Sequence, residues 1–311
     1  MRSWAVPGLF DEYGTEGEAM EISASLVKEL RVKTGVGMME CKSALTEAKG
    51  DLSEAEKILR KKGLAAAANK AGRATGEGVV AARVDESGRI AVLVETNCET
   101  DFCARGADFQ SLVATSLDAA LTRGAATSGA TADAAACDAL CDSSGPDGRS
   151  LRQTFGEAVG KIGENMHLRR FVKFERASPS SILAAYIHTG AKIGVLVEAE
   201  TDTGRSTATD ALLRDVAMHI AAASPRFLSR EDVSAKALSD EQEIARDQAM
   251  KAGKPPQVVE KIVAGRLEKY YGEACLLDQP FVKDSDKTVR QHLGDTTKVR
   301  RFARFVLGES A

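Results

Sequence analysis

The chain has 311 residues, more than a single domain usually contains, so two or three modules are expected. Hydrophobic residues make up 43% and charged residues 28%, and 42 basic residues nearly balance 45 acidic ones, for a formal charge of -3. This balance gives no reason to expect a nucleic acid or a membrane as partner. No apolar run reaches the roughly 18 residues of a membrane-spanning helix, and the N-terminus lacks the apolar core of a signal peptide, so we expect a cytoplasmic protein.

Residues 1–19 show no periodicity and are rich in glycine and acidic residues, which predicts a disordered leader. Three short helical patterns follow within residues 20–63, each with an apolar face and with capping residues or glycines at its ends. The residues that define them are Ser23, Leu26, Val27, Leu30, Gly35, Met38, Leu45, Asp51, Ala55, Ile58 and Leu59. So small a bundle is marginally stable alone, so we expect it to dock on the rest of the chain or to present apolar surface to a partner. Residues 64–73 are interpreted as a helical or loosely ordered linker.

An internal repeat comes next. The segment 89–95 (RIAVLVE) recurs as 192–198 (KIGVLVE), and each copy is preceded by an apolar strand pattern and a turn glycine, Gly88 or Gly190. A helical pattern follows each copy, and both halves close on a similar strand, LRRFVKF at 168–174 and VRRFARF at 299–305. We therefore predict an α+β protein whose core consists of two related units, residues 74–177 and 178–311, each with an antiparallel sheet covered by helices, rather than a parallel βαβ sheet.

The second unit carries an insertion at about residues 234–283. Two apolar stripes at helical spacing flank a turn at 253–256 (GKPP), which predicts an antiparallel helical hairpin. The stripes comprise Leu238, Ile244, Ala245, Ala249 and Met250, then Val258, Val259, Ile262, Val263 and Leu267. Two interpretations stay open: a tip that contacts a partner, or a solvated structural arm.

The motifs of common catalytic sites are absent. The sequence contains no phosphate-binding GxxxxGK[ST] or GxGxxG motif, no HExxH metal site and no GxSxG serine elbow. A thiol pair of Cys98 or Cys103 with a histidine is conceivable, but buried cysteines usually act as small hydrophobic residues. We therefore expect no catalytic residue, no metal, no cofactor and no enzymatic activity.

Short basic strings occur at 60–62, 169–170 and 300–301 and raise the possibility of RNA contacts. Arginine alternating with phenylalanine is typical of a sheet with one covered face, and no aromatic RNA-binding motif accompanies these strings. We expect solvated faces there and no direct binding of nucleic acid.

Several motifs, in this order, resemble the elongation factor Ts family between about residues 20 and 307. They are SLVKELR at 25–31, TGVGMMECK at 34–42, NCETDF at 97–102, KIGEN at 161–165, AMH at 217–219 and QPFV at 279–282. The resemblance implies an N-terminal three-helix domain of the ubiquitin-associated (UBA-like) type, a two-part core and a coiled-coil insertion. It also implies elongation factor Tu as the partner and guanine-nucleotide exchange as the function, with a dimer as a further possibility.

The resemblance further implies roles for individual residues. Asp101 and Phe102, flanked by Thr100 and Cys103, are expected to enter the partner GTPase near its magnesium site, with Phe102 inserted between two helices. Further partner contacts are expected at the positions Met38, Met39, Cys41 and His188. The residues alone leave other roles open, namely packing within the bundle for the methionines and a local hydrogen bond for His188.

Two other functions stay open at this point. A translation-associated adaptor would bind its partners without releasing nucleotide. An RNA-binding protein would bind through its arginine-rich strands, with an affinity that falls steeply with salt.

Overall fold

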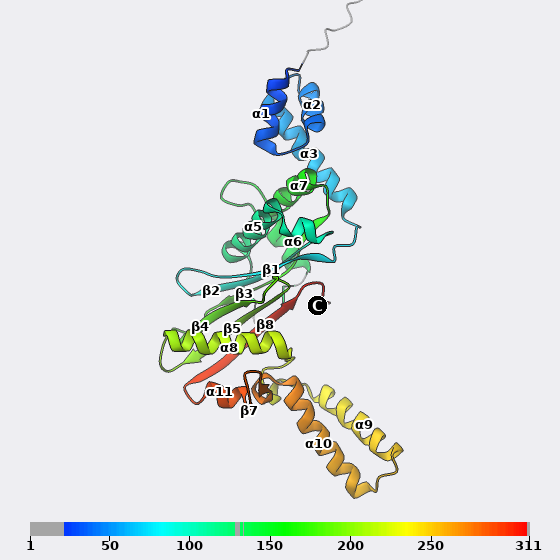
Figure 1. Ribbon diagram of the computed structural model, residues 1–311, viewed down its shortest axis with the longest axis vertical. Coiled ribbons are helices and arrows are strands. Elements are labelled where there is room, and N and C mark those ends of the chain that lie inside the picture. The colour runs from blue at the N-terminus through cyan, green and yellow to red at the C-terminus, as the bar shows by residue number, and fades with distance from the viewer. Residues whose placement is uncertain (1–21, 128–130, 133, 310–311) are drawn as a thin grey trace, which may run out of the picture.

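The computed structural model describes residues 22–127, 131–132 and 134–309, so the leader expected at 1–19 lies outside the described residues. The molecule is elongated: a helical bundle forms one end, two sheets with helices on their outer faces form the middle, and a helical hairpin forms the other end (Figure 1). Helices combined with antiparallel sheets confirm the predicted α+β class. No helix in the described ranges is long and apolar enough to cross a membrane.

The N-terminal bundle consists of α1 (Ala24–Thr34), α2 (Met38–Glu47) and α3 (Leu52–Lys70). Ser23 caps α1, Asp51 caps α3, and Gly35 ends α1 in the left-handed conformation that glycine adopts most easily. Its core is made of Val27, Leu30, Cys41, Ala44, Leu45, Ala55 and Leu59. Helix α3 continues beyond the bundle, so residues 64–70 are helical, and it packs there against α7 (Leu151–Ile162).

The first unit of the core contains a sheet of three antiparallel strands in the order β1-β2-β3, and the second contains β4-β5-β8. The strands are β1 (Glu77–Val84), β2 (Ile90–Cys98), β3 (Met166–Glu175), β4 (Ser181–Ile187), β5 (Ile193–Thr201) and β8 (Thr297–Val306). The register shifts after Glu95 in the first sheet and after Glu198 in the second, at the same place in both central strands. The predicted repeat is therefore confirmed, and the two units also share this irregularity, which was not predicted.

Helices cover the outer face of each sheet, and the inner faces pack against each other (Figure 1). The helices are α4 (Asp101–Arg105), α5 (Ala107–Arg123), α6 (Ala134–Asp142) and α7 on the first sheet, and α8 (Thr207–Ala223) on the second. A Cβ atom at Gly194 would lie 2.6 Å from Val80 Cγ1, so glycine permits the close approach of the two sheets at this point.

Two arginines connect the units symmetrically. Arg170 forms an ion pair with the buried Glu95 (2.6 Å) and lies 4.3 Å from the ring centre of Phe305. Arg301 pairs in the same way with Glu198 (2.7 Å), 4.2 Å from the ring of Phe174 in the other unit. The expectation that both arginine pairs form solvated faces was wrong for these two residues, because each is drawn inward by a buried glutamate. Their guanidinium groups are thus engaged in contacts within the chain.

The insertion forms the predicted antiparallel hairpin, α9 (Ala235–Lys251) and α10 (Pro256–Ala274), at the far end of the molecule (Figure 1). The chain then passes through β6 (Pro280–Phe281), β7 (Asp284–Thr288) and α11 (Val289–Leu293) into β8. Ala245, Ala249, Val259 and Val263 form the seam of the hairpin. Ile244, Met250 and Val258 were expected in the same stripes but are exposed, because two helices alone bury only a narrow seam.

Candidate partner-binding site

Phe102 is the most exposed large hydrophobic side chain of the described residues, with 82% of its surface accessible. Its segment was expected to be a loop, but it is the first turn of helix α4, which Thr100 caps by accepting a hydrogen bond from the backbone N–H of Cys103 (3.1 Å). Cys103 and Ala104 on the other side of this short helix are buried in the core of the first unit. The helix is thus anchored on one side and presents Phe102 to solvent on the other.

The turn that begins α4 is joined to the end of α7. The carboxylate of Glu164 accepts hydrogen bonds from the backbone N–H (3.0 Å) and the hydroxyl (2.7 Å) of Thr100. In the opposite direction, the carboxylate of Glu99 accepts a hydrogen bond from the backbone N–H of Asn165 (2.6 Å). This bond, together with Arg73, lowers the pKa of Glu99 below its ordinary value. In the sequence this stretch is the KIGEN motif at 161–165, and no contact was predicted for Glu164.

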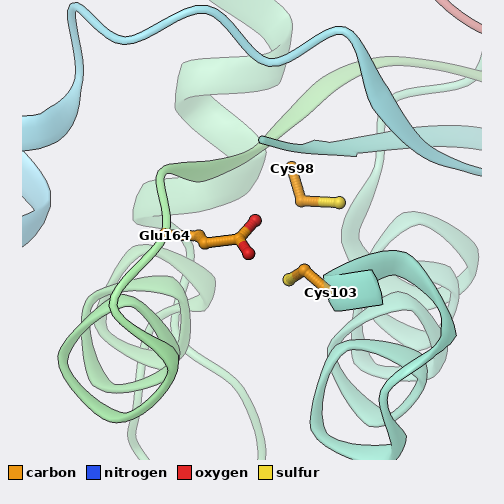
Figure 2. A group of neighbouring side chains, drawn as sticks. All are labelled: Cys98, Cys103 and Glu164. Carbon is orange, nitrogen blue, oxygen red and sulfur yellow. The ribbon is translucent and has the colours of Figure 1, made fainter. Parts of the chain in front are cut away.

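Cys98, Cys103 and Glu164 converge beneath α4, with their ligand atoms within 4.8 Å of one another (Figure 2). Thiolates and carboxylates are ligands for zinc, so the donor types alone would suit a metal ion. Both oxygens of Glu164, however, already accept hydrogen bonds from Thr100. Burial raises the pKa of Cys98 to about 11 and also raises the pKa of Cys103, so both thiols are protonated at neutral pH. The thiol of Cys98 donates to the carbonyl oxygen of Thr100 (3.2 Å), and we interpret the group as a packed support for α4.

The methionines of the bundle are on its surface: Met38 is 43% and Met39 is 76% exposed, at the beginning of α2. Cys41, one turn later, is fully buried, and its thiol lies 3.5 Å from the carbonyl oxygen of Val36. Of the expected partner contacts, Cys41 and Cys103 therefore pack inside the protein, whereas Met38 and Met39 are exposed apolar side chains.

His188 is exposed at the turn between β4 and β5, with Nδ1 2.9 Å from the hydroxyl of Tyr186. This turn contacts the first unit: the carbonyl oxygen of Ala191 accepts a hydrogen bond from Val80 (2.8 Å), and Lys192 pairs with Glu77 (2.9 Å). Ala191 also packs on the hydrophobic core that includes Cys103 and Ala104. The structure therefore brings the turn of His188 to the same end of the core as α4.

Lys161 connects the bundle to this region. Its Nζ atom lies 2.6 Å from a carboxylate oxygen of Asp108, at the start of α5, and its side chain passes directly over Gly35 in the turn that precedes α2. Contacts thus link the segments of Met38, Phe102 and His188, which are far apart in the sequence. We take these three segments together as the candidate face.

Comparison with known proteins places these features in a family. The family model described as elongation factor TS matches residues 99–309. The elongation factor Ts of Trichlorobacter lovleyi is 47% identical over 300 residues, which cover 93% of this chain and 94% of the relative. That of Syntrophotalea carbinolica is also 47% identical, over 299 residues and the same shares of both chains. That of Prosthecochloris aestuarii is 44% identical over 295 residues, 93% of this chain and 99% of the relative.

Proposed function

Because the chain belongs to the elongation factor Ts family, we propose that it is a guanine-nucleotide exchange factor for elongation factor Tu in translation elongation, without covalent chemistry of its own. The observation that carries the proposal is the exposure of Phe102 on a helix whose opposite side is anchored in the core. An apolar side chain held outward in this way has little use within its own chain and suits insertion into another protein.

The proposed mechanism acts on the metal of the partner. In a GTPase, nucleotide is held by backbone amides, a lysine and a Mg²⁺ ion that bridges the phosphates. Asp101 and Phe102 enter near this ion, and Phe102 separates two helices of the partner, so that the ion is displaced and the charge of the phosphates is less well compensated. In the free protein Asp101 is paired with Arg105, an exposed pair on one helix that costs little to break.

The exchange cycle follows from reciprocity. If the factor weakens the binding of GDP, nucleotide weakens the binding of the factor by the same ratio, so incoming GTP expels the factor. A shift in relative affinity of about 10⁴ requires roughly 5.5 kcal/mol, whereas burial of one phenylalanine supplies about 1.5 to 3 kcal/mol. Met38, Met39 and His188 on the candidate face are proposed to supply part of the remainder.

In this proposal the chain has the divisions expected from its sequence. The bundle of residues 20–63 is one contact module, joined by the linker 64–73 to the core subdomains 74–177 and 178–311. The hairpin at about 234–283 is an arm of the second subdomain.

The direct test is the release of a fluorescent GDP analogue from elongation factor Tu, measured with and without this protein. The proposal predicts faster release that increases with the concentration of the factor. An adaptor would instead bind elongation factor Tu stably and leave the release rate unchanged, and that result would contradict the proposal.

A further inference from the structure

We propose that Glu164 is a positioning residue for nucleotide exchange, which fixes the direction in which helix α4 presents Phe102 to the partner. This inference rests on the proposed function and goes beyond it by assigning a role to a residue outside the candidate face.

Both carboxylate oxygens of Glu164 are bound to Thr100. One accepts the hydrogen bond of the Thr100 backbone N–H, and the other accepts the Thr100 hydroxyl. Because the Thr100 hydroxyl points its proton at the carboxylate of Glu164, the lone pairs of the Thr100 hydroxyl oxygen are free to accept a hydrogen bond from the backbone N–H of Cys103. This second hydrogen bond is the cap of α4. Glu164 thus determines the orientation of the cap, and the cap determines the orientation of the first turn, which contains Phe102.

The connection between these two segments, 64 residues apart in the sequence, runs in both directions. Thr100 donates twice to Glu164, and Asn165 donates to Glu99. Gly163 makes this meeting possible, because its left-handed backbone (φ 88°) ends α7 and turns the chain toward α4. Helix α7 also packs against α3, so one helix holds both α4 and the bundle that carries Met38 and Met39.

The second unit of the core has no counterpart of Phe102, and it also lacks the pair of hydrogen bonds from Thr100 to Glu164, here called the carboxylate clamp. The repeat aligns Thr203 with Thr100, and there the backbone N–H of Thr203 donates to the hydroxyl of Thr201, two residues earlier (3.3 Å). Asp295 stands at the position that corresponds to Glu164, but among the described residues no hydrogen bond joins it to Thr203. The carboxylate clamp is therefore a property of the unit that presents the aromatic side chain, rather than a general requirement of this sheet.

The physical consequence concerns preorganisation. Phe102 is 82% exposed, so packing within its own chain does little to fix its direction, and its position depends on the backbone of α4. A residue presented in the geometry of the complex loses less conformational freedom on binding, and small misplacements reduce rates strongly.

The test compares Glu164→Ala, Glu164→Gln and, as a matched control, Glu273→Ala on the exposed surface of α10. The rate of GDP release from elongation factor Tu is measured over a range of factor concentrations. We expect Glu164→Ala to lower the maximal rate about tenfold while the half-saturating concentration changes much less, since charge-assisted hydrogen bonds are lost but the other contacts remain. Glu164→Gln should recover part of the rate, because its amide oxygen still accepts one of the two bonds. Glu273→Ala should behave as the unchanged protein.

A second measurement separates this inference from the proposed function. In the free protein, hydrogen exchange at the amides of Cys103 and Ala104 should accelerate in Glu164→Ala while the exchange of the sheet amides stays unchanged. If the unchanged protein fails to release GDP, the proposed function is wrong, and the amides still report on the clamp. The inference is overturned if these amides exchange as before, or if Glu164→Ala retains the full maximal rate of a factor that does release GDP.

Discussion

Gly63 of α3 and Gly156 of α7 meet so closely that a Cβ atom on Gly63 would lie 2.8 Å from the carbonyl oxygen of Gly156. The contact belongs to the crossing that joins the N-terminal bundle to the core, and Arg60 and Glu157 add an ion pair beside it (3.0 Å). Because the obstacle is backbone, a side chain at position 63 can be accommodated only if the two helices move apart.

We therefore predict that Gly63→Ala destabilises the protein by about 1 to 3 kcal/mol, although alanine is the better helix former. Gly265→Ala on α10 is the matched control, since nothing lies within 4 Å of the added methyl group, and it should stabilise by up to about 1 kcal/mol. Urea denaturation of both variants checks this. Equal stabilisation by the two substitutions would show that the helices do not cross closely at Gly63.

The second prediction concerns the bundle surface. Met39 and Val32 are both exposed there, at 76% and 80%, but only Met39 belongs to the candidate face. Met39→Ala should weaken binding to elongation factor Tu about fivefold or more, as expected for a buried interface contact, without changing the melting temperature. Val32→Ala should leave the affinity within about twofold, since isolated surface apolar residues contribute little. Calorimetric titration measures both, and equal losses of affinity would argue against a specific role of Met39.

The third prediction is a dependence of stability on pH. His219 is fully buried on α8: its Nδ1 accepts the N–H of Val282 (3.1 Å), and its Nε2 lies 2.9 Å from the side-chain oxygen of Gln279. The ring is therefore neutral with its proton on Nε2, and burial lowers its pKa. The unfolded chain, with a histidine pKa of about 6.5, binds the proton more readily, so this part of the stability is complete above about pH 6.5 and is lost as the pH falls below it.

Thermal unfolding between pH 7.5 and 5.5 tests this. The melting temperature should fall toward pH 5.5, and His219→Gln, although less stable at pH 7.5, should show a weaker dependence on pH. His188→Gln, at the exposed turn, should retain the full dependence. Burial also lowers the pKa of His167, so the melting temperature of His219→Gln should still depend weakly on pH. An unchanged slope in His219→Gln would contradict the assignment.

Much of the fold could be predicted because its signals are local. The repeated segments at 89–95 and 192–198 form the central strands β2 and β5, and the apolar stripes of the insertion lie on the two helices α9 and α10. The exposure of Ile244 and Met250 could not be predicted in this way, because a stripe shows which face of a helix is apolar but not how wide a seam the partner helix covers. The buried position of Arg170 likewise depends on Glu95, which is on a neighbouring strand.

The candidate site was predictable only in part, because several of its contacts join segments that are far apart in the sequence. Threonine followed by an acidic residue is a common beginning of a helix, so Thr100 and Asp101 indicate a helix at the place where a loop was predicted. Nothing in the local sequence indicates that Glu164 meets Thr100, because the contact joins segments 64 residues apart and depends on the turn at Gly163. The burial of Cys41 and Cys103 fits the general tendency of free cysteine to be buried, but it depends on how their helices pack, which the local sequence does not show.

The central claim is that Phe102 acts on the partner and contributes little to its own fold, and the most direct measurement is GDP release from elongation factor Tu by Phe102→Ala. Val282→Ala is the control, because Val282 is also exposed, at 56%, and lies outside the candidate face. The account predicts that Phe102→Ala lowers the release rate by about tenfold or more, with an unchanged melting temperature, while Val282→Ala retains the rate. Release by Phe102→Ala at the rate of the unchanged protein would contradict the account.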